Sequence, residues 1–306
     1  MGLPYDSGVA NYLSPTLHSR IKSGGTWRWV DQLSVKSGGS WRTVKQAYVK
    51  SGGSWRKFHD AENVFTFSVT LTGTRTSTFN LGTWLTTSGY NSPSLGRVYN
   101  NGDRIRGLIT VDGNAGGNPG IYIGSFTSGS IVYIKVNSNR RIAGRGGNGG
   151  NVGAGGQSAG TALYTRTPVY IQNNGNMWGG GGGGRGGNNG QCVGTYYYNY
   201  NCGKNCYRQG TGYNYNPASG GGGGGGAGIP AGSGRQRGNN GSYNSGGNGG
   251  SGNGCGSNSG GKGGNPGQNA TGGNSGSNGN SGNYIDGASY VYSWVSTGDR
   301  RGRSSG

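Results

Sequence analysis

Residues 144–157 read Gly-Arg-Gly-Gly-Asn-Gly-Gly-Asn-Val-Gly-Ala-Gly-Gly-Gln, and they decide the fold of the second half of the chain. Glycine recurs at every third position from Gly144 to Gly156, with further glycines between. A period of three is typical of the polyproline II conformation, which has three residues per turn and leaves its backbone polar groups to pair with neighbours. Collagen shares this period, but 8 prolines in 306 residues exclude a collagen triple helix. We therefore predict polyglycine II rods.

Glycine-rich tracts return at 179–190, 220–228 and 238–282. Rods that run back and forth would satisfy each other's backbone N–H and C=O groups across a bundle. The alternative interpretation is a flexible glycine linker. The tracts alternate with aromatic segments, however, and these need a fixed scaffold if they are to act together. We predict a polyglycine II domain over 144–306, with a closing strand at 284–295.

A repeat of period 14 precedes the glycine-rich half. The motif Lys-Ser-Gly-Gly-Ser/Thr-Trp-Arg occurs at 22–28, 36–42 and 50–56. Ser-Gly-Gly supplies the positive φ that a tight hairpin turn requires, so we predict three β-hairpins over 21–60. A single hairpin is marginal in water, so the three are expected to stack on one another, on sister chains or on another protein. The buried anchors would be Trp27, Trp41 and Trp55.

Residues 61–143 alternate apolar and polar side chains, as in Val64-Phe-Thr-Phe-Ser-Val69 and Ile131-Val-Tyr-Ile-Lys-Val136. Turn signals such as Asn101-Gly102 and Asp112-Gly113 separate these runs. We predict a compact antiparallel β-sandwich here. The expected fold class is mainly β with little or no helix: hairpin repeats, a sandwich-like domain, and a bundle of polyglycine II rods with aromatic loops.

The charged residues argue against catalysis. The net charge of +19 favours an anionic partner, such as nucleic acid, phospholipid or a bacterial envelope. Positions 113–285 contain no Asp or Glu, and the only histidines are His18 and His59. Glycoside hydrolysis needs a carboxylate pair, and histidine triads or metal sites need partners that are missing here. We predict a protein that is not an enzyme and that holds no cofactor or metal.

The aromatic segment between two glycine tracts resembles an antibody paratope in composition. Tyrosine supplies large amphipathic area at low entropic cost, while Asn, Ser and Gly adapt their hydrogen bonds. Nearby arginines can make charge-assisted contacts with phosphate or carboxylate groups. The alternative is that the tyrosines merely pack over the ends of the rods. The predicted recognition residues are Tyr196, Tyr197, Tyr198, Tyr200, Tyr207, Arg208, Tyr213, Tyr215, Arg235 and Arg237.

The order of these motifs resembles the glycine-rich domains of tailed-phage tail proteins. The segment Asn139 to Trp178 and the ending Tyr284-Ile-Asp-Gly-Ala-Ser-Tyr-Val291 carry the resemblance. The architecture is also similar to the tip adhesins of T-even long tail fibres. That resemblance implies a sandwich of polyglycine II rods whose loops at one end bind an outer-membrane protein. The Lys-Ser-Gly-Gly-Ser-Trp repeats are likewise found in tail and baseplate proteins.

The resemblance implies a non-catalytic receptor-binding adhesin of a phage tail, made in the host cytoplasm and carried on the virion. Residues 1–20 would be a tail-attachment segment, and the three tryptophans would contact other tail or fibre proteins. The expected partner at the other end is an outer-membrane protein or surface polysaccharide of the bacterium. The chain is either a homotrimer or a single copy that caps a trimeric fibre.

Four cysteines, Cys192, Cys202, Cys206 and Cys255, allow three disulfide pairings. They lack zinc-site spacing, so we predict a bridge within 192–206, although synthesis in a reducing cytoplasm also allows free thiols. Two rival functions remain. One is a purely structural tail component. The other is a glycine-rich RNA-binding protein that uses Gly-Arg-Gly-Gly at 144–147 and 184–187, but it lacks an RNP1-type motif, and nucleic acid is not the expected partner.

Overall fold

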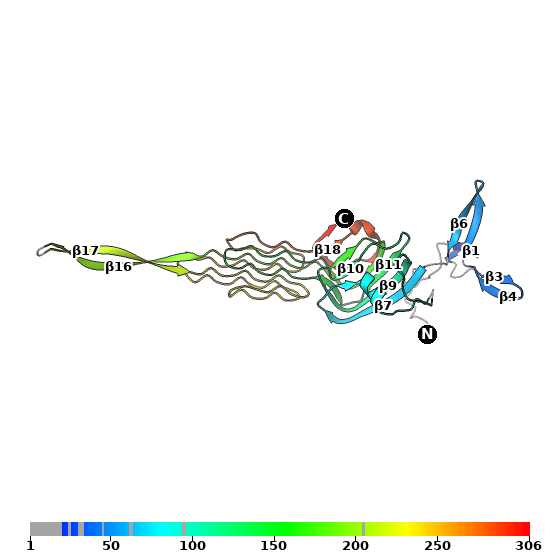
Figure 1. Cartoon of the computed structure of the whole chain (residues 1–306), viewed down its shortest axis with the longest axis horizontal. Coiled ribbons are helices and arrows are strands. Elements are labelled where there is room, and N and C mark those ends of the chain that lie inside the picture. Colours follow the sequence, from blue (N-terminus) through cyan, green and yellow to red (C-terminus); the bar gives the residue numbers. More distant parts are fainter. Residues whose placement is uncertain are drawn as a thin grey trace.

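The computed structural model describes residues 20–23, 26–29, 34–44, 46–60, 64–93, 96–203 and 206–306. The chain is elongated and built mainly of strands (Figure 1). Within these ranges it has one short α-helix, α1 (Leu81–Thr87), and one 3₁₀ turn, η1 (Ala288–Tyr290). The mainly β prediction is confirmed. No helix of the described part is long and apolar enough to cross a membrane.

Each sequence repeat forms an antiparallel hairpin of its own. The hairpins pair β1 (Arg20–Ser23) with β2 (Thr26–Trp29), β3 (Ser34–Ser37) with β4 (Ser40–Thr43), and β5 (Gln46–Ser51) with β6 (Ser54–Asp60). In the second hairpin, Gly38 and Gly39 have φ of 59° and 81°, the left-handed region that glycine adopts without strain. Gly52 and Gly53 of the third hairpin have φ of 59° and 80°, so Ser-Gly-Gly closes the turn in both hairpins whose turns the structure describes.

Trp41 and Trp55 are not buried within the single chain, so their predicted burial on sister chains or on another protein stays a prediction. Trp41 is 72% exposed and Trp55 is 68% exposed. Each hairpin is a separate two-stranded sheet, so no second layer covers the indole rings. Each ring lies beside a lysine across the strands, Lys36 opposite Trp41 and Lys50 opposite Trp55. The side chain of Trp27 lies outside the described residues.

The domain after the hairpins is a parallel β-solenoid, not the predicted antiparallel sandwich. Its five coils stack strand on strand, and every pair within its two sheets is parallel. The coils comprise β7 (Val64–Arg75) and β8 (Phe79–Asn80); β9 (Arg104–Gly117) and β10 (Ile121–Ile123); β11 (Ile131–Val136), β12 (Arg141–Gly144) and β13 (Leu163–Thr165); β14 (Val169–Asn173), β15 (Asn176–Trp178) and β18 (Asn283–Asp286); and β19 (Val291–Ser296), β20 (Asp299–Arg301) and β21 (Arg303–Ser305).

The prediction was wrong because an alternating pattern fits either architecture, and the turn dipeptides were assigned to hairpins. Asp112-Gly113 lies inside β9, where that strand changes its partner from β11 to β12. The predicted domain boundary at residue 143 also differs from the structure, because strands within 163–178 and 283–305 belong to the coils of the solenoid. The expected closing strand at 284–295 is β18, η1 and part of β19, and it belongs to the solenoid rather than to the rods.

Inward-facing residues of successive coils stack in register and form the core. One column runs Phe79, Ile121, Leu163, Ile285, and all four are at most 3% exposed. Further columns run Val69, Ile109, Ile134, Ile171 and Ala115, Ile142, Met177. This stacking is how a solenoid with few apolar residues per coil obtains a continuous core.

Both glycine-rich insertions leave the solenoid at the same corner. Residues 145–162 connect β12 to β13 and residues 179–282 connect β15 to β18, while β12 stacks on β15 and β13 on β18. We call the glycine segments of these insertions the glycine bundle: 144–160, 179–189 and 219–282. In Figure 1 the bundle lies between the solenoid and a long hairpin at the far end of the molecule.

Segment 179–189 runs through the bundle, and most of its glycines are buried. Its hydrogen-bond partners change with a period of three, so that each third residue faces the same neighbouring segment. The amides of Gly180, Gly183 and Gly186 donate to the carbonyls of Gly160, Gln157 and Ala154, and those of Gly181, Gly184 and Gly187 donate to Ala227, Gly224 and Gly221. This is the spacing that threefold rods require. The polyglycine II conformation itself stays a prediction.

Candidate functional site

The far end of the molecule is a hairpin of β16 (Gly190–Gly203) and β17 (Cys206–Ala218), which we call the tyrosine hairpin. It extends from the bundle on the side opposite the solenoid (Figure 1). Segment 179–189 leads directly into β16, and β17 returns into segment 219–228. These two glycine segments are hydrogen-bonded to each other, with Gly187 N 2.8 Å from Gly221 O. The bundle therefore sets the position of both strands.

Alternation along β16 divides the predicted tyrosines between two faces. Tyr196, Tyr198 and Tyr200 share one face, which we call the ladder face. Their ring centroids are 6.0 Å apart from Tyr196 to Tyr198 and again from Tyr198 to Tyr200. Arg208 lies directly opposite Tyr200 on β17 and is exposed, so a cation lies at one end of the row of rings.

Two glycines of β17 leave room for two rings of the ladder face. Gly212 is opposite Tyr196 and Gly210 is opposite Tyr198. A Cβ at Gly212 would lie 2.4 Å from Cζ of Tyr196, and one at Gly210 would lie 2.6 Å from Cζ of Tyr198. The hydroxyl oxygen and one Cε of each tyrosine lie almost as close, so the outer part of each ring lies over its glycine. Neighbouring rings of the row are tilted by 42° and 43° to one another.

Sequence reasoning missed Gly210 and Gly212, although a signal was present. Gly-Thr-Gly at 210–212 has the same two-residue period as the tyrosines of β16. A hairpin that pairs the two runs places a small residue under each ring, because residues directly opposite one another share a face. The register of β16 against β17 was needed to see this.

The other predicted hairpin tyrosines lie on the reverse face. Tyr197 is 67% exposed, Tyr213 57% and Tyr215 58%, whereas the tyrosines of the ladder face are 43–47% exposed. Val193 lies opposite Tyr215 and is 56% exposed. The side chain of Tyr207 lies outside the described residues. The structure therefore separates the predicted tyrosines into two surfaces that a rigid ligand cannot contact together.

Arg235 and Arg237 are not part of either face. They lie on a turn of the bundle near the base of the hairpin, where Gly222 N donates to Gln236 O at 2.9 Å and Arg235 N donates to Gly223 O at 3.0 Å. Gln236 and Arg237 have φ of 30° and 67°. Both arginines are exposed. They add positive charge near the base of the hairpin, away from its tyrosine rings.

A disulfide joins the base of the tyrosine hairpin to a turn of the bundle. It links Cys192 to Cys255, residues 63 apart in the sequence, with a Cα–Cα distance of 4.7 Å. Cys192 thus pairs outside the range 192–206, because β16 carries it next to the 253–256 turn rather than to a cysteine of its own hairpin, and the expected bridge within 192–206 stays a prediction for the other cysteines of the hairpin. Cys202 is also disulfide-bonded.

The aspartates whose side chains the structure describes each pair with an arginine. Asp103 accepts two hydrogen bonds of 2.8 Å from the guanidinium of Arg97, and this pairing holds the pKa of Asp103 below its usual range. The pKa of Asp112 is also lowered, first by a hydrogen bond from Asn137 and then by Arg140. Asp286 pairs with Arg166, and Asp299 pairs with Arg301. In the described ranges no three His, Cys, Asp or Glu residues gather as metal ligands.

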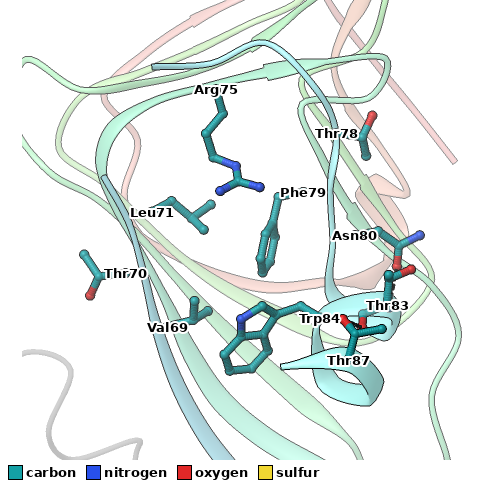
Figure 2. A pocket seen from close by; sticks show the side chains of 10 residues that line it. All are labelled: Val69, Thr70, Leu71, Arg75, Thr78, Phe79, Asn80, Thr83, Trp84 and Thr87. Carbon is teal, nitrogen blue, oxygen red and sulfur yellow. Dashed lines mark hydrogen bonds between the residues drawn. The ribbon is translucent and has the colours of Figure 1, made fainter. Parts of the chain in front are cut away.

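A small cavity lies in the first coil of the solenoid, far from the tyrosine hairpin. Its volume is about 360 Å³. Figure 2 shows Leu71, Phe79 and Trp84 around its floor, Arg75 beside Phe79, and threonines around the rim. The guanidinium carbon of Arg75 is 5.8 Å from the centroid of the Phe79 ring. The ten lining residues include no Asp, Glu, His or Cys, so the cavity offers no side chain for general acid or base catalysis at neutral pH.

Three comparisons relate the chain to known proteins. It matches the family model described as phage tail fibre adhesin Gp38 over residues 65–305. No curated protein sequence matches it. Among solved structures, it is similar to the crystal structure of the gp37-gp38 adhesin tip complex of the bacteriophage S16 long tail fiber, with 22% identity and a TM-score of 0.45. That alignment covers 80% of this chain and 83% of the other.

Proposed function

The chain belongs to the phage tail fibre adhesin Gp38 family, and on this premise we propose that it binds a receptor on the bacterial surface without catalysing a reaction. The family match bears out the resemblance to tail adhesins. The observation that carries the proposal is the tyrosine hairpin, an exposed aromatic surface at the end of the molecule opposite the N-terminal hairpins (Figure 1). Such a surface has the composition of a protein paratope.

The glycine bundle supports this role as a rigid support. We take its segments to be polyglycine II rods, because their hydrogen bonds repeat every three residues and because a Cβ on most of their glycines would collide with a neighbouring backbone. For example, a Cβ on Gly183 would lie 1.9 Å from the carbonyl oxygen of Asn148. Rods packed this closely hold the tyrosine hairpin away from the solenoid.

We further propose that the N-terminal hairpins attach the chain to other tail fibre proteins. Trp41 and Trp55 are exposed apolar anchors, and tryptophan is enriched at the centres of protein interfaces. Three copies of one hairpin in a single chain offer three equivalent docking units. This number fits a single chain that caps a trimeric fibre better than a homotrimer of this chain, which would present nine.

An RNA-binding role is less consistent with the geometry. In the second Gly-Arg-Gly-Gly motif, the Arg185 guanidinium donates to the carbonyls of Gly272 at 2.8 Å and Gly276 at 3.0 Å. The neighbouring glycines are buried in the bundle. A motif that is occupied in this way is not free to contact a nucleic-acid backbone.

Cell adsorption tests the proposal. The purified protein is expected to bind cells of particular strains in a bacterial panel and to block infection by a phage that carries it. Replacement of Tyr196, Tyr198, Tyr200 and Arg208 by alanine should abolish both effects without altering the circular dichroism spectrum. Tyr292→Ala is the matched control, because that tyrosine is 70% exposed but lies on the solenoid. Undiminished adsorption by the hairpin variant would favour a purely structural role.

A further inference from the structure

We propose that the ladder face of the tyrosine hairpin binds an acidic surface polysaccharide, by stacking of sugar rings on Tyr196, Tyr198 and Tyr200 and by pairing of an anionic substituent with Arg208. This inference rests on the proposed adhesin function and names its ligand class. The alternative ligand, an outer-membrane protein, becomes an outcome of the test.

The first argument is the shape of the surface. The rings of Tyr196 and Tyr198 lie over glycine backbone, and the three exposed rings follow one another at centroid separations of 6.0 Å with a tilt of 42° and 43° between neighbours. The negative π-face of an aromatic ring attracts groups with positive edges, and the C–H groups on one side of a pyranose ring are such an edge. A row of exposed rings, each turned by about the same angle from the one before, suits a linear glycan that twists along its length and places one sugar unit on each ring.

The second argument is that the ladder face is a shallow strip and not a deep pocket. Energetically dominant residues in protein interfaces cluster in well-packed, fully desolvated pockets. Here the three rings are each 43–47% exposed, and glycine rather than a bulky side chain faces each of the first two across the strands. Such a strip cannot enclose an aromatic or aliphatic anchor from a protein partner. A linear glycan needs only a strip of this kind.

The third argument is charge and hydrogen bonding. The hairpin carries no carboxylate, since positions 113–285 contain neither Asp nor Glu, and the chain as a whole is +19. Arg208 can pair with a phosphate or carboxylate on the glycan. Asn214 and Asn216 lie on the ladder face beyond the rings and are exposed. Their amides offer both donors and acceptors to sugar hydroxyls.

The test compares two probes prepared from one strain that the full-length protein binds. The first is the strain's surface polysaccharide, free of lipid and protein, taken in separate arms from its lipopolysaccharide and from its capsule. The second is the strain's outer-membrane protein fraction, reconstituted in vesicles without lipopolysaccharide. Binding of each probe is measured by calorimetry at low and physiological salt. The wild-type protein should bind at least one polysaccharide, more weakly as salt rises, and should not bind the vesicles.

Two variants remove or displace a ring of the ladder face, and two control variants leave these rings in place. Tyr198→Ala removes the middle ring, and Gly210→Ala displaces it, because the new Cβ would lie 2.6 Å from its Cζ. Both should lower the affinity for polysaccharide by about three- to tenfold, the size of change expected for one lost stacking contact in a multi-ring site. Gly194→Ala is the matched control, since its Cβ would meet nothing closer than 3.9 Å. Tyr197→Ala controls for a ring on the reverse face. Both controls should stay within twofold of wild type.

Three results would overturn the inference. These are binding to the protein vesicles alone, an unchanged affinity for polysaccharide in Tyr198→Ala, or an equal loss in Tyr197→Ala. Each of them leaves the adhesin function standing as long as the protein still binds whole cells. Absence of binding to any cells would instead contradict the proposed function itself.

Discussion

Alanine at Gly183 is expected to destabilise the glycine bundle strongly. Gly183 lies in the middle of segment 179–189, and its amide donates to Gln157 O at 2.9 Å while its carbonyl accepts from Gly279 N at 2.8 Å. A Cβ would lie 1.9 Å from the carbonyl oxygen of Asn148, whereas real Cβ atoms essentially never approach closer than 3.0 Å. The two segments must therefore separate by at least 3.0 − 1.9 = 1.1 Å.

A displacement of this size is too large for all the hydrogen bonds around Gly183 to be kept. A bond of 2.9 Å weakens beyond about 3.5 Å, so a 1.1 Å shift of segment 179–189 breaks at least one buried bond. Overpacking costs about 1–3 kcal/mol, and an unpaired buried amide costs about 1–3 kcal/mol more. Alanine recovers about 0.4–1 kcal/mol by restricting the unfolded chain. The net loss in the free energy of unfolding is about 1–6 kcal/mol.

Urea unfolding followed by circular dichroism, together with hydrogen exchange of the bundle amides, measures this effect. Gly194→Ala on the tyrosine hairpin is the control, because its Cβ has no neighbour within 3.9 Å. We expect the control to resemble wild type and Gly183→Ala to exchange its bundle amides faster. If Gly183→Ala instead unfolds like the control, the close packing of the glycine segments is refuted, and with it the rigid support of the binding surface.

Three further predictions concern other parts of the chain. In Asp103→Asn, the free energy of unfolding measured with urea should fall less steeply between pH 7 and pH 3 than in the wild type. The pKa of Asp103 is lowered in the folded protein, so its carboxylate stabilises the wild type above the pKa of the unfolded state, and this stability is lost as pH falls through the folded pKa. The variant has no carboxyl group at this position. Alanine at both Trp41 and Trp55 should leave the melting temperature unchanged, because both rings are exposed, but should abolish co-purification with the fibre proteins; a lower melting temperature would mean that the rings pack within the chain. Cys255→Ser should accelerate hydrogen exchange at 190–194 and 253–257 while leaving the solenoid amides unchanged, and equal exchange in both proteins would show that the bridge does not hold the hairpin base.

The pairing of the glycine segments could be predicted from the sequence. A period of three predicts that every third residue faces the same neighbour, and the structure pairs Gly180, Gly183 and Gly186 with the same neighbouring segment. The hairpins were also predictable, because Ser-Gly-Gly permits few turns. In both cases the information lies within a few consecutive residues.

The solenoid was not predictable from the same kind of evidence. The alternating pattern in Ile131–Val136 indicates that one side of a strand is buried, but it does not indicate whether the neighbouring strand runs parallel or antiparallel. The direction depends on connections that span from a few residues to more than a hundred, as between β15 and β18. The Cys192–Cys255 disulfide could not be predicted for the same reason, since it depends on where two segments that are far apart in the sequence lie in the fold.

The threefold period also explains how a glycine bundle can carry the tyrosine hairpin without losing its own packing. In segment 179–189 the first non-glycine residue is Arg185, and its position in the period turns its side chain to the edge of the bundle, where it binds carbonyls at Gly272 and Gly276. A loss of one residue before Arg185 would rotate every later position by a third of a turn and drive this side chain into backbone. A loss of three would preserve the facing of every residue. Beyond Gly190 the antiparallel hairpin has a period of two instead, so its faces can change residue by residue while the glycine segments that carry it stay unaltered.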